Sequence, residues 1–79
     1  MYFPIITLST DFGDSDGFTA SMKGVIFSID RRAMVVDAMH DVPSGNVAHA
    51  SFALAAFVPY FPLDSIHVVV VDPGVGTIR

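Results

Sequence analysis

The stretch VVVVDPGVGTIR, residues 68–79, decides the fold class. Four consecutive valines suit a strand that is buried on both faces, because β-branched side chains pack well on a pleated surface and neither face is left polar. Strands of this kind usually belong to parallel sheets. In an open parallel sheet, the loops that leave the carboxyl ends of the strands line the ligand crevice. The stretch therefore predicts a buried central strand that presents Asp72 at that crevice, with Pro73 and Gly74 turning the chain.

The rest of the chain alternates strand and helix patterns. Short β-branched runs mark two more strands, and apolar residues at helical spacing mark two helices. The predicted order is strand 4–10, helix 17–30, strand 34–38, helix 44–57 and strand 65–71, with Ser15 or Asp16 capping the first helix and Ser44 the second. One face of the first helix carries Phe18, Met22, Val25, Ile26 and Ile29. Because short loops favour right-handed crossovers between parallel strands, the sequence predicts an α/β fold, a βαβαβ half of a doubly wound, mainly parallel sheet.

Length and composition indicate that part of the apolar surface is buried against another domain or subunit. A domain of 79 residues buries only about 60% of the surface that its unfolded chain exposes. Yet 52% of the residues are hydrophobic and the mean hydropathy is +0.59. We therefore expect part of a larger fold, or an oligomer. The absence of cysteine excludes a disulfide framework and thiolate metal sites.

Charge and hydropathy exclude two classes of partner. The net charge is −4, and a basic face for a nucleic-acid backbone is missing. The longest uncharged run, residues 42–63, is interrupted by Pro43, Pro59 and Pro62 and makes a poor membrane span. The N-terminus lacks the basic region of a signal peptide. We expect a cytoplasmic protein with neither nucleic-acid nor membrane partners.

Acidic residues follow or finish each predicted strand. Asp11, Asp37 and Asp72 should therefore approach one edge of a parallel sheet. Asp37 lies inside a strand pattern, and we expect a structural role for it. For Asp11, Gly13 allows the backbone to approach a ligand closely, and a carboxylate after the first strand of a nucleotide-binding fold can accept both ribose hydroxyls; the open alternative is a simple turn acid. Asp16 lies where a helix dipole would keep it ionised.

Phosphate-binding and metal-binding motifs are missing from these loops. Neither G-x-G-x-x-G nor G-x-x-x-x-G-K-[ST] occurs, and Gly74-Val75-Gly76 by itself is a weak signal. The DFG of protein kinases matches Asp11-Phe12-Gly13 only out of context, in a small chain without a glycine-rich phosphate loop. The spacing of His40, His49 and His67 does not suit a metal site, and we expect structural roles for them. We therefore expect no metal and no cofactor.

The segments TLSTDFGDSDGF, MKGVIFSI, VVDAMHDVP and HVVVVDPGVGTIR, taken together, resemble the S-adenosyl-L-methionine hydroxide adenosyltransferase family, relatives of the S-adenosylmethionine-dependent chlorinase and fluorinase. The similarity runs from Ile5 to Arg79, and TDFG, MKG and VDPGVGT-x-R in this order are a specific match. The resemblance implies an N-terminal α/β domain followed by a smaller β domain, in a trimer with sites between subunits. Residues 1–79 would be part of the first domain, and the second is absent from this chain.

The resemblance also implies an activity, the hydrolysis of S-adenosyl-L-methionine to adenosine and L-methionine by attack of a water-derived oxygen on the ribose C5′. The family uses an Asp-Arg-His set whose first two members match Asp72 and Arg79, while its histidine lies beyond residue 79. The sulfonium is a good leaving group that needs no acid, so the enzyme must position the nucleophile and manage its proton. Asp72 would orient or polarise the water, and Arg79 would hold the oxygen or the acid.

Substrate-binding residues follow from the same resemblance. Asp11 matches the ribose-binding acid, Asp16 the acid near the methionine amine, and Phe12 belongs to the same substrate-binding segment. Halogenating relatives have a tyrosine at the position of Asp72, which disfavours halide as the nucleophile here. Their adenine-stacking aromatic residue falls at Gly45, so adenine must be held in another way.

Two other classes of function remain open at the level of sequence. The chain could be a non-catalytic nucleoside-binding or assembly module with the same fold. It could also carry a magnesium site that acts on a phosphate ester, if Asp11, Asp37 and Asp72 converge on a metal. Release of adenosine from S-adenosylmethionine, with and without a chelator, separates these hypotheses from a hydrolase.

Overall fold

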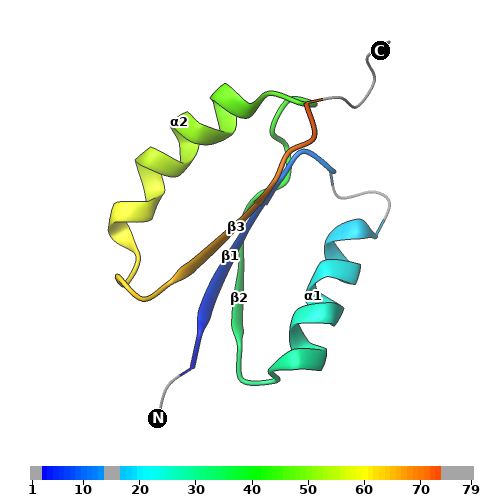
Figure 1. Cartoon of the computed structure of the whole chain (residues 1–79), viewed down its shortest axis with the longest axis vertical. Coiled ribbons are helices and arrows are strands. Elements are labelled where there is room, and N and C mark those ends of the chain that lie inside the picture. The colour runs from blue at the N-terminus through cyan, green and yellow to red at the C-terminus, as the bar shows by residue number, and fades with distance from the viewer. Residues whose placement is uncertain (1–2, 14–16, 74–79) are drawn as a thin grey trace.

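The computed structural model describes residues 3–13 and 17–73. Strands and helices alternate along the chain in the predicted order (Figure 1). The elements are β1 (Ile5–Thr10), α1 (Phe18–Ile29), β2 (Met34–Met39), α2 (Val47–Phe57), the 3₁₀ turn η1 (Val58–Tyr60) and β3 (Ile66–Val70). Pro59, which cannot continue a helix, lies in η1 and ends α2.

The three strands form one parallel sheet in the order β2-β1-β3. α1 lies on one side of this sheet and α2 on the other (Figure 1). Thr10, the last residue of β1, is in register with Val70, the last residue of β3. The register with β2 shifts between Leu8 and Ser9, so that Ser9 lies opposite Met39. The predicted α/β fold, half of a doubly wound parallel sheet, is confirmed.

The prediction that the valine strand is central is wrong for the described residues. β1 is the central strand, and its residues Thr7, Leu8, Ser9 and Thr10 are fully buried. β3 pairs only with β1 in this part of the chain, and Val69 keeps 38% of its surface exposed. A run of valines indicates that both faces of a strand are apolar, but it does not determine the place of the strand in the sheet. That place follows from the two crossovers, which put β2 and β3 on opposite sides of β1.

Both predicted helix caps also differ from the structure. The N-cap of α1 is Gly17, with φ of 74° and no side-chain hydrogen bond, while Ser15 and Asp16 lie outside the described residues. The N-cap of α2 is Asn46, whose side-chain oxygen accepts the backbone N–H of His49 at 2.9 Å, instead of Ser44. The helix starts later than predicted because Gly45 first takes a left-handed conformation.

α1 buries only part of the apolar face that its periodicity predicts. Phe18, Val25 and Ile29 are exposed by 58%, 62% and 83%. Met22 and Ile26 of that face are half-buried, as is Lys23, whose Nζ reaches Asp37 Oδ2 on β2 at 2.5 Å. The helix therefore faces the sheet with a side that includes a charged residue. Within residues 3–13 and 17–73, the helices are too short or too polar to cross a membrane.

Candidate functional site at the carboxyl edge of the sheet

The loops that follow the three strands are joined by backbone hydrogen bonds. Asp11 N–H donates to the Val70 carbonyl at 3.3 Å, which ties the exit of β1 to β3. Gly13 N–H donates to the His40 carbonyl at 2.8 Å, which ties the same turn to the exit of β2. Figure 1 shows these segments meeting at one end of the sheet, next to the start of α2. The parallel topology thus gathers all three exits at one edge, as the sequence predicts.

Asp11 occupies the turn directly after the central strand. Its side chain is half-buried, and Oδ2 accepts the backbone N–H of Gly45 at 2.8 Å. Within the described segments, this amide is the one hydrogen-bond donor to the Asp11 carboxylate. A carboxylate held by one oxygen has a defined orientation and keeps acceptor capacity at the other. Asp11 Oδ1 therefore has acceptor capacity that no described residue uses.

Gly45 links Asp11 to the turn after β3. Its φ is +71°, a left-handed conformation that glycine adopts without steric cost. A Cβ at this position would lie 3.1 Å from both the Asp72 carbonyl oxygen and Pro73 Cα, closer than ordinary contacts. The backbone of residues 72 and 73 is therefore seated directly on Gly45. Asp11 and the Asp72 turn, more than 60 positions apart in sequence, adjoin the same residue.

A buried polar chain lies beneath the Asp11 turn. Thr10 Oγ1 is 2.8 Å from His40 Nδ1, and His40 Nε2 is 2.7 Å from Asp37 Oδ1. The His40 side chain is only 6% exposed. The hydrogen bond from His40, followed by the one from Lys23, holds the pKa of Asp37 below its ordinary value. Asp37 is thus engaged in contacts with its neighbours, in agreement with the structural role expected for it.

The contacts of Asp37 also bear on the magnesium hypothesis. Its two oxygens face Lys23 and His40. Among residues 3–13 and 17–73, no three His, Cys, Asp or Glu side chains gather closely enough to hold a metal ion. The three acids of the strand exits therefore do not form a shared carboxylate cage.

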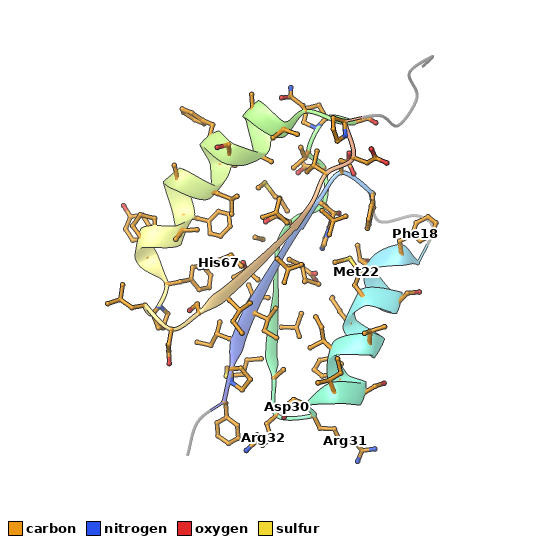
Figure 2. The ribbon with its side chains drawn as sticks, in the orientation of Figure 1. Phe18, Met22, Asp30, Arg31, Arg32 and His67 are labelled. Atoms are coloured by element: carbon orange, nitrogen blue, oxygen red, sulfur yellow. The ribbon has the colours of Figure 1, made fainter. Side chains whose placement is uncertain are left out.

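The other described cations lie far from this edge. Figure 2 shows Asp30, Arg31 and Arg32 in the turn between α1 and β2, at the opposite end of the sheet. Arg32 Nε lies 3.1 Å from Asp30 Oδ1, and this hydrogen bond lowers the pKa of Asp30. The arginines of this turn are therefore too distant to contribute to the candidate site.

One known protein family matches nearly the whole chain. The sequence model of the SAM hydroxide adenosyltransferase N-terminal domain matches residues 6–79. The chain belongs to this family.

Relatives within the SAM hydroxide adenosyltransferase family are similar along nearly the whole chain. The (R)-S-adenosyl-L-methionine hydrolase of Salinispora arenicola is 47% identical over 76 residues, which cover 96% of the chain and 29% of that protein. The protein of the same name from Methanocaldococcus jannaschii is 42% identical over 79 residues, covering 95% of the chain and 30% of that protein. A fluorinase from Actinopolyspora mzabensis is 30% identical over 74 residues, or 94% of the chain and 25% of the enzyme.

A solved structure shares the fold. The crystal structure of a conserved hypothetical protein from Thermus thermophilus superposes with a TM-score of 0.81 at 36% identity, covering 96% of the chain and 32% of that protein. The chain thus spans less than a third of the length of these relatives. The resemblance indicated by the sequence motifs is confirmed.

The residues that the family resemblance assigns to the site fall into two groups. Asp11, Phe12 and Asp72 lie in the turns at the carboxyl edge, and the Phe12 ring packs against Phe18 with centroids 5.8 Å apart. Asp16 and Arg79 lie outside the described residues. Their predicted roles near the methionine amine and the nucleophile stay predictions.

The hydrogen bonds of the other two histidines lie outside the Asp11 turn. His67 Nδ1 bonds Thr7 Oγ1 at 2.7 Å, and its ring packs edge-on against Phe57 and Phe61 near the start of β3 (Figure 2). His49 takes part through its backbone N–H, which is bonded by the cap of α2.

Sequence reasoning missed two parts of this edge. Neither the Thr10–His40 contact nor the joint at Gly45 was predicted. The available signals were a histidine placed directly after a strand and a Gly-Asn pair directly before a helix, and both patterns are common in loops of other kinds.

Proposed function

We propose that the chain provides the nucleoside-binding edge of an S-adenosyl-L-methionine hydrolase that forms adenosine and L-methionine. The observation that carries this proposal is the joint at Gly45, which adjoins both the Asp11 carboxylate and the Asp72–Pro73 turn. A ribose bound to Asp11 would thus have its C5′ near the turn that bears Asp72. The names of the relatives, which specify (R)-S-adenosyl-L-methionine, support the same substrate.

In this proposal Asp11 binds the ribose. Its Oδ2 is held by the Gly45 amide at 2.8 Å, and its Oδ1 accepts from the ribose hydroxyls. Vicinal hydroxyls are two donors set close together, which suits a carboxylate that is already oriented. Phe12 supplies an apolar surface beside this contact, and Asp16 attracts the methionine ammonium.

Asp72 acts at the reacting carbon. A water oxygen forms a bond to C5′ while the bond between C5′ and sulfur breaks, and methionine departs as a neutral thioether with the bonding electron pair. One proton of the attacking water passes to solvent water as adenosine forms. Asp72 orients the water and accepts its hydrogen bond, while Arg79 holds the oxygen or the acid in line.

The second domain of the family and a trimeric assembly would complete the site between subunits in a cytoplasmic enzyme. Exclusion of water by such cover strengthens the interaction of Asp72 and Arg79 with the reacting oxygen. The apolar surface of this chain supports the need for cover, since Ile29, Phe52 and Tyr60 are more than 80% exposed.

The test compares the chain alone with a chimaera in which residues 1–79 precede the remainder of the Salinispora arenicola relative. The chimaera should release adenosine from S-adenosylmethionine at a rate that a chelator does not change. The chain alone should release no adenosine from this substrate. Adenosine binding by the chimaera without turnover would favour the non-catalytic module. Loss of activity with the chelator would favour the metal-dependent alternative.

A further inference from the structure

The buried Thr10–His40–Asp37 chain has no part in the proposed chemistry. His40 lies beneath the Asp11 turn, with both ring nitrogens bonded to protein and 6% of its side chain exposed. Thr10 is fully buried. A buried imidazole that is hydrogen-bonded at both nitrogens is fixed in position, so it can also fix the positions of its hydrogen-bond partners and of the groups that these partners contact.

Two of the hydrogen-bond directions can be assigned from the partners. Asp37 is kept ionised by hydrogen bonds from His40 and Lys23 and can only accept, so His40 Nε2 carries a proton and donates it to Asp37. Phe12 N–H donates to Thr10 Oγ1 at 3.2 Å. Thr10 Oγ1 and His40 Nδ1 share a hydrogen bond of 2.8 Å, whose direction is set by the ring tautomer. The chain of hydrogen bonds is thus continuous from Asp37 through His40 and Thr10 to the Phe12 amide.

The backbone amides of the Asp11 turn depend on this chain. Asp11 N–H is bonded by β3, through the Val70 carbonyl. Phe12 N–H is bonded by Thr10 Oγ1, whose hydroxyl is oriented by the His40 ring, and Gly13 N–H is bonded by the His40 carbonyl at 2.8 Å. His40 thus holds two of the three amides of the turn, one through its side chain and one through its backbone.

We propose that His40 is a positioning residue that fixes the turn of residues 11–13 and, with it, the Asp11 carboxylate. His40 does not touch the ligand; it acts through Thr10 and through its own carbonyl. The link continues through Asp37 to Lys23, so that α1 and the turn are joined by side chains. The inference rests on the proposed function only in taking the turn as a nucleoside site.

The first test needs no ligand. Nitrogen NMR of the labelled 79-residue chain should show a proton on His40 Nε2, held in the hydrogen bond to Asp37. Amide hydrogen exchange should then be compared for Thr10→Val, which removes the hydroxyl at nearly constant volume, and Thr10→Ser, which keeps it. In Thr10→Val the exchange of both Phe12 and Gly13 should accelerate about tenfold, while Thr10→Ser should stay within about twofold of the parent.

Gly13 is the decisive amide because its acceptor, the His40 carbonyl, is untouched by either substitution. Faster exchange at Gly13 in Thr10→Val therefore reports transmission through His40. Unchanged exchange at Gly13, or the absence of a proton on His40 Nε2, would overturn the proposal. His40→Asn is a second variant whose side-chain amide can replace Nδ1 as the hydrogen-bond partner of Thr10; it should protect Gly13 better than His40→Ala does.

Adenosine titration separates this inference from the proposed function. If both hold, Thr10→Val weakens adenosine binding about tenfold and Thr10→Ser restores it. If Asp11→Ala leaves adenosine binding unchanged, the assignment of the turn as a nucleoside site fails, while the exchange rates still decide the role of His40. Equal adenosine affinity in Thr10→Val and the parent, in a chain where Asp11→Ala abolishes binding, would contradict His40 as the positioning residue.

Discussion

Replacement of Gly45 by alanine is the most direct test of the joint between the two acidic turns. An L-residue in the left-handed conformation costs about 1–2 kcal/mol, and Gly45 has φ of +71°. The added Cβ would also lie 3.1 Å from the Asp72 carbonyl oxygen and from Pro73 Cα. These are backbone atoms that cannot rotate away, and such overpacking typically costs a further ~1–3 kcal/mol. We expect a total destabilisation of about 2–5 kcal/mol.

Two glycines of the same chain separate these contributions. Gly13 has the same φ of +71°, but a Cβ added there would have no atom within 4 Å, so Gly13→Ala should show only the conformational cost. Gly24 lies inside α1 with open space around it, so Gly24→Ala should stabilise the chain by roughly 0.5–1 kcal/mol. Urea unfolding followed by circular dichroism gives all three free energies of unfolding.

One result would show that the Asp72–Pro73 turn does not pack on Gly45 in solution. In that case Gly45→Ala would lower the free energy of unfolding by no more than Gly13→Ala does. The expected cost is a large part of the total stability, which for 79 residues is roughly 4–12 kcal/mol. Where the variant still folds, its adenosine affinity should also fall, because the shifted amide of residue 45 no longer orients Asp11.

Three further predictions concern single acids. In the chimaera, Asp72→Asn should lower turnover far more than adenosine affinity, whereas equal losses would make Asp72 a binding residue. Asp11→Ala should weaken binding of adenosine and of S-adenosylmethionine alike, and calorimetry with unchanged affinities would remove it from the site. Because the pKa of Asp37 is lowered in the folded chain, its contribution to stability is complete above about pH 4 and is lost as the pH falls through the folded pKa. Asp37→Asn should therefore reduce the loss of unfolding free energy at acidic pH, by less than about 1 kcal/mol because the side chain is 43% exposed. If the loss at acidic pH is the same in Asp37→Asn and the parent, other carboxylates cause it.

Much of the fold was predictable because each strand and helix has a local pattern. The valine run, the β-branched segments and the helical spacing of apolar residues placed all three strands and both long helices within a few residues. The order of strands in the sheet was not predictable in this way. It depends on where each crossover returns. A run of valines such as Val68–Val71 suits a central strand and a strand with a single neighbour equally well.

The candidate site was predictable at the level of loops and not of contacts. Parallel strands alone bring Asp11 and Asp72 to one edge. The contact that joins them uses a backbone N–H and the missing side chain of Gly45, neither of which leaves a distinctive pattern in sequence. His40 was hidden for a similar reason: its contacts join it to Thr10, Asp37 and the turn at Gly13, and no short motif encodes them.

The packing around Gly45 also makes two positions of the chain interdependent in evolution. The family resemblance implies that the halogenating relatives carry an aromatic residue at the position of Gly45 and a tyrosine at that of Asp72. Any side chain at residue 45 would meet the backbone of residues 72 and 73 in the present geometry. An aromatic ring can therefore be accommodated only if the exit of β3 moves, and that movement displaces the residue at position 72. Replacements at residues 45 and 72 should therefore be epistatic, with either one alone disfavoured and the two tolerated together.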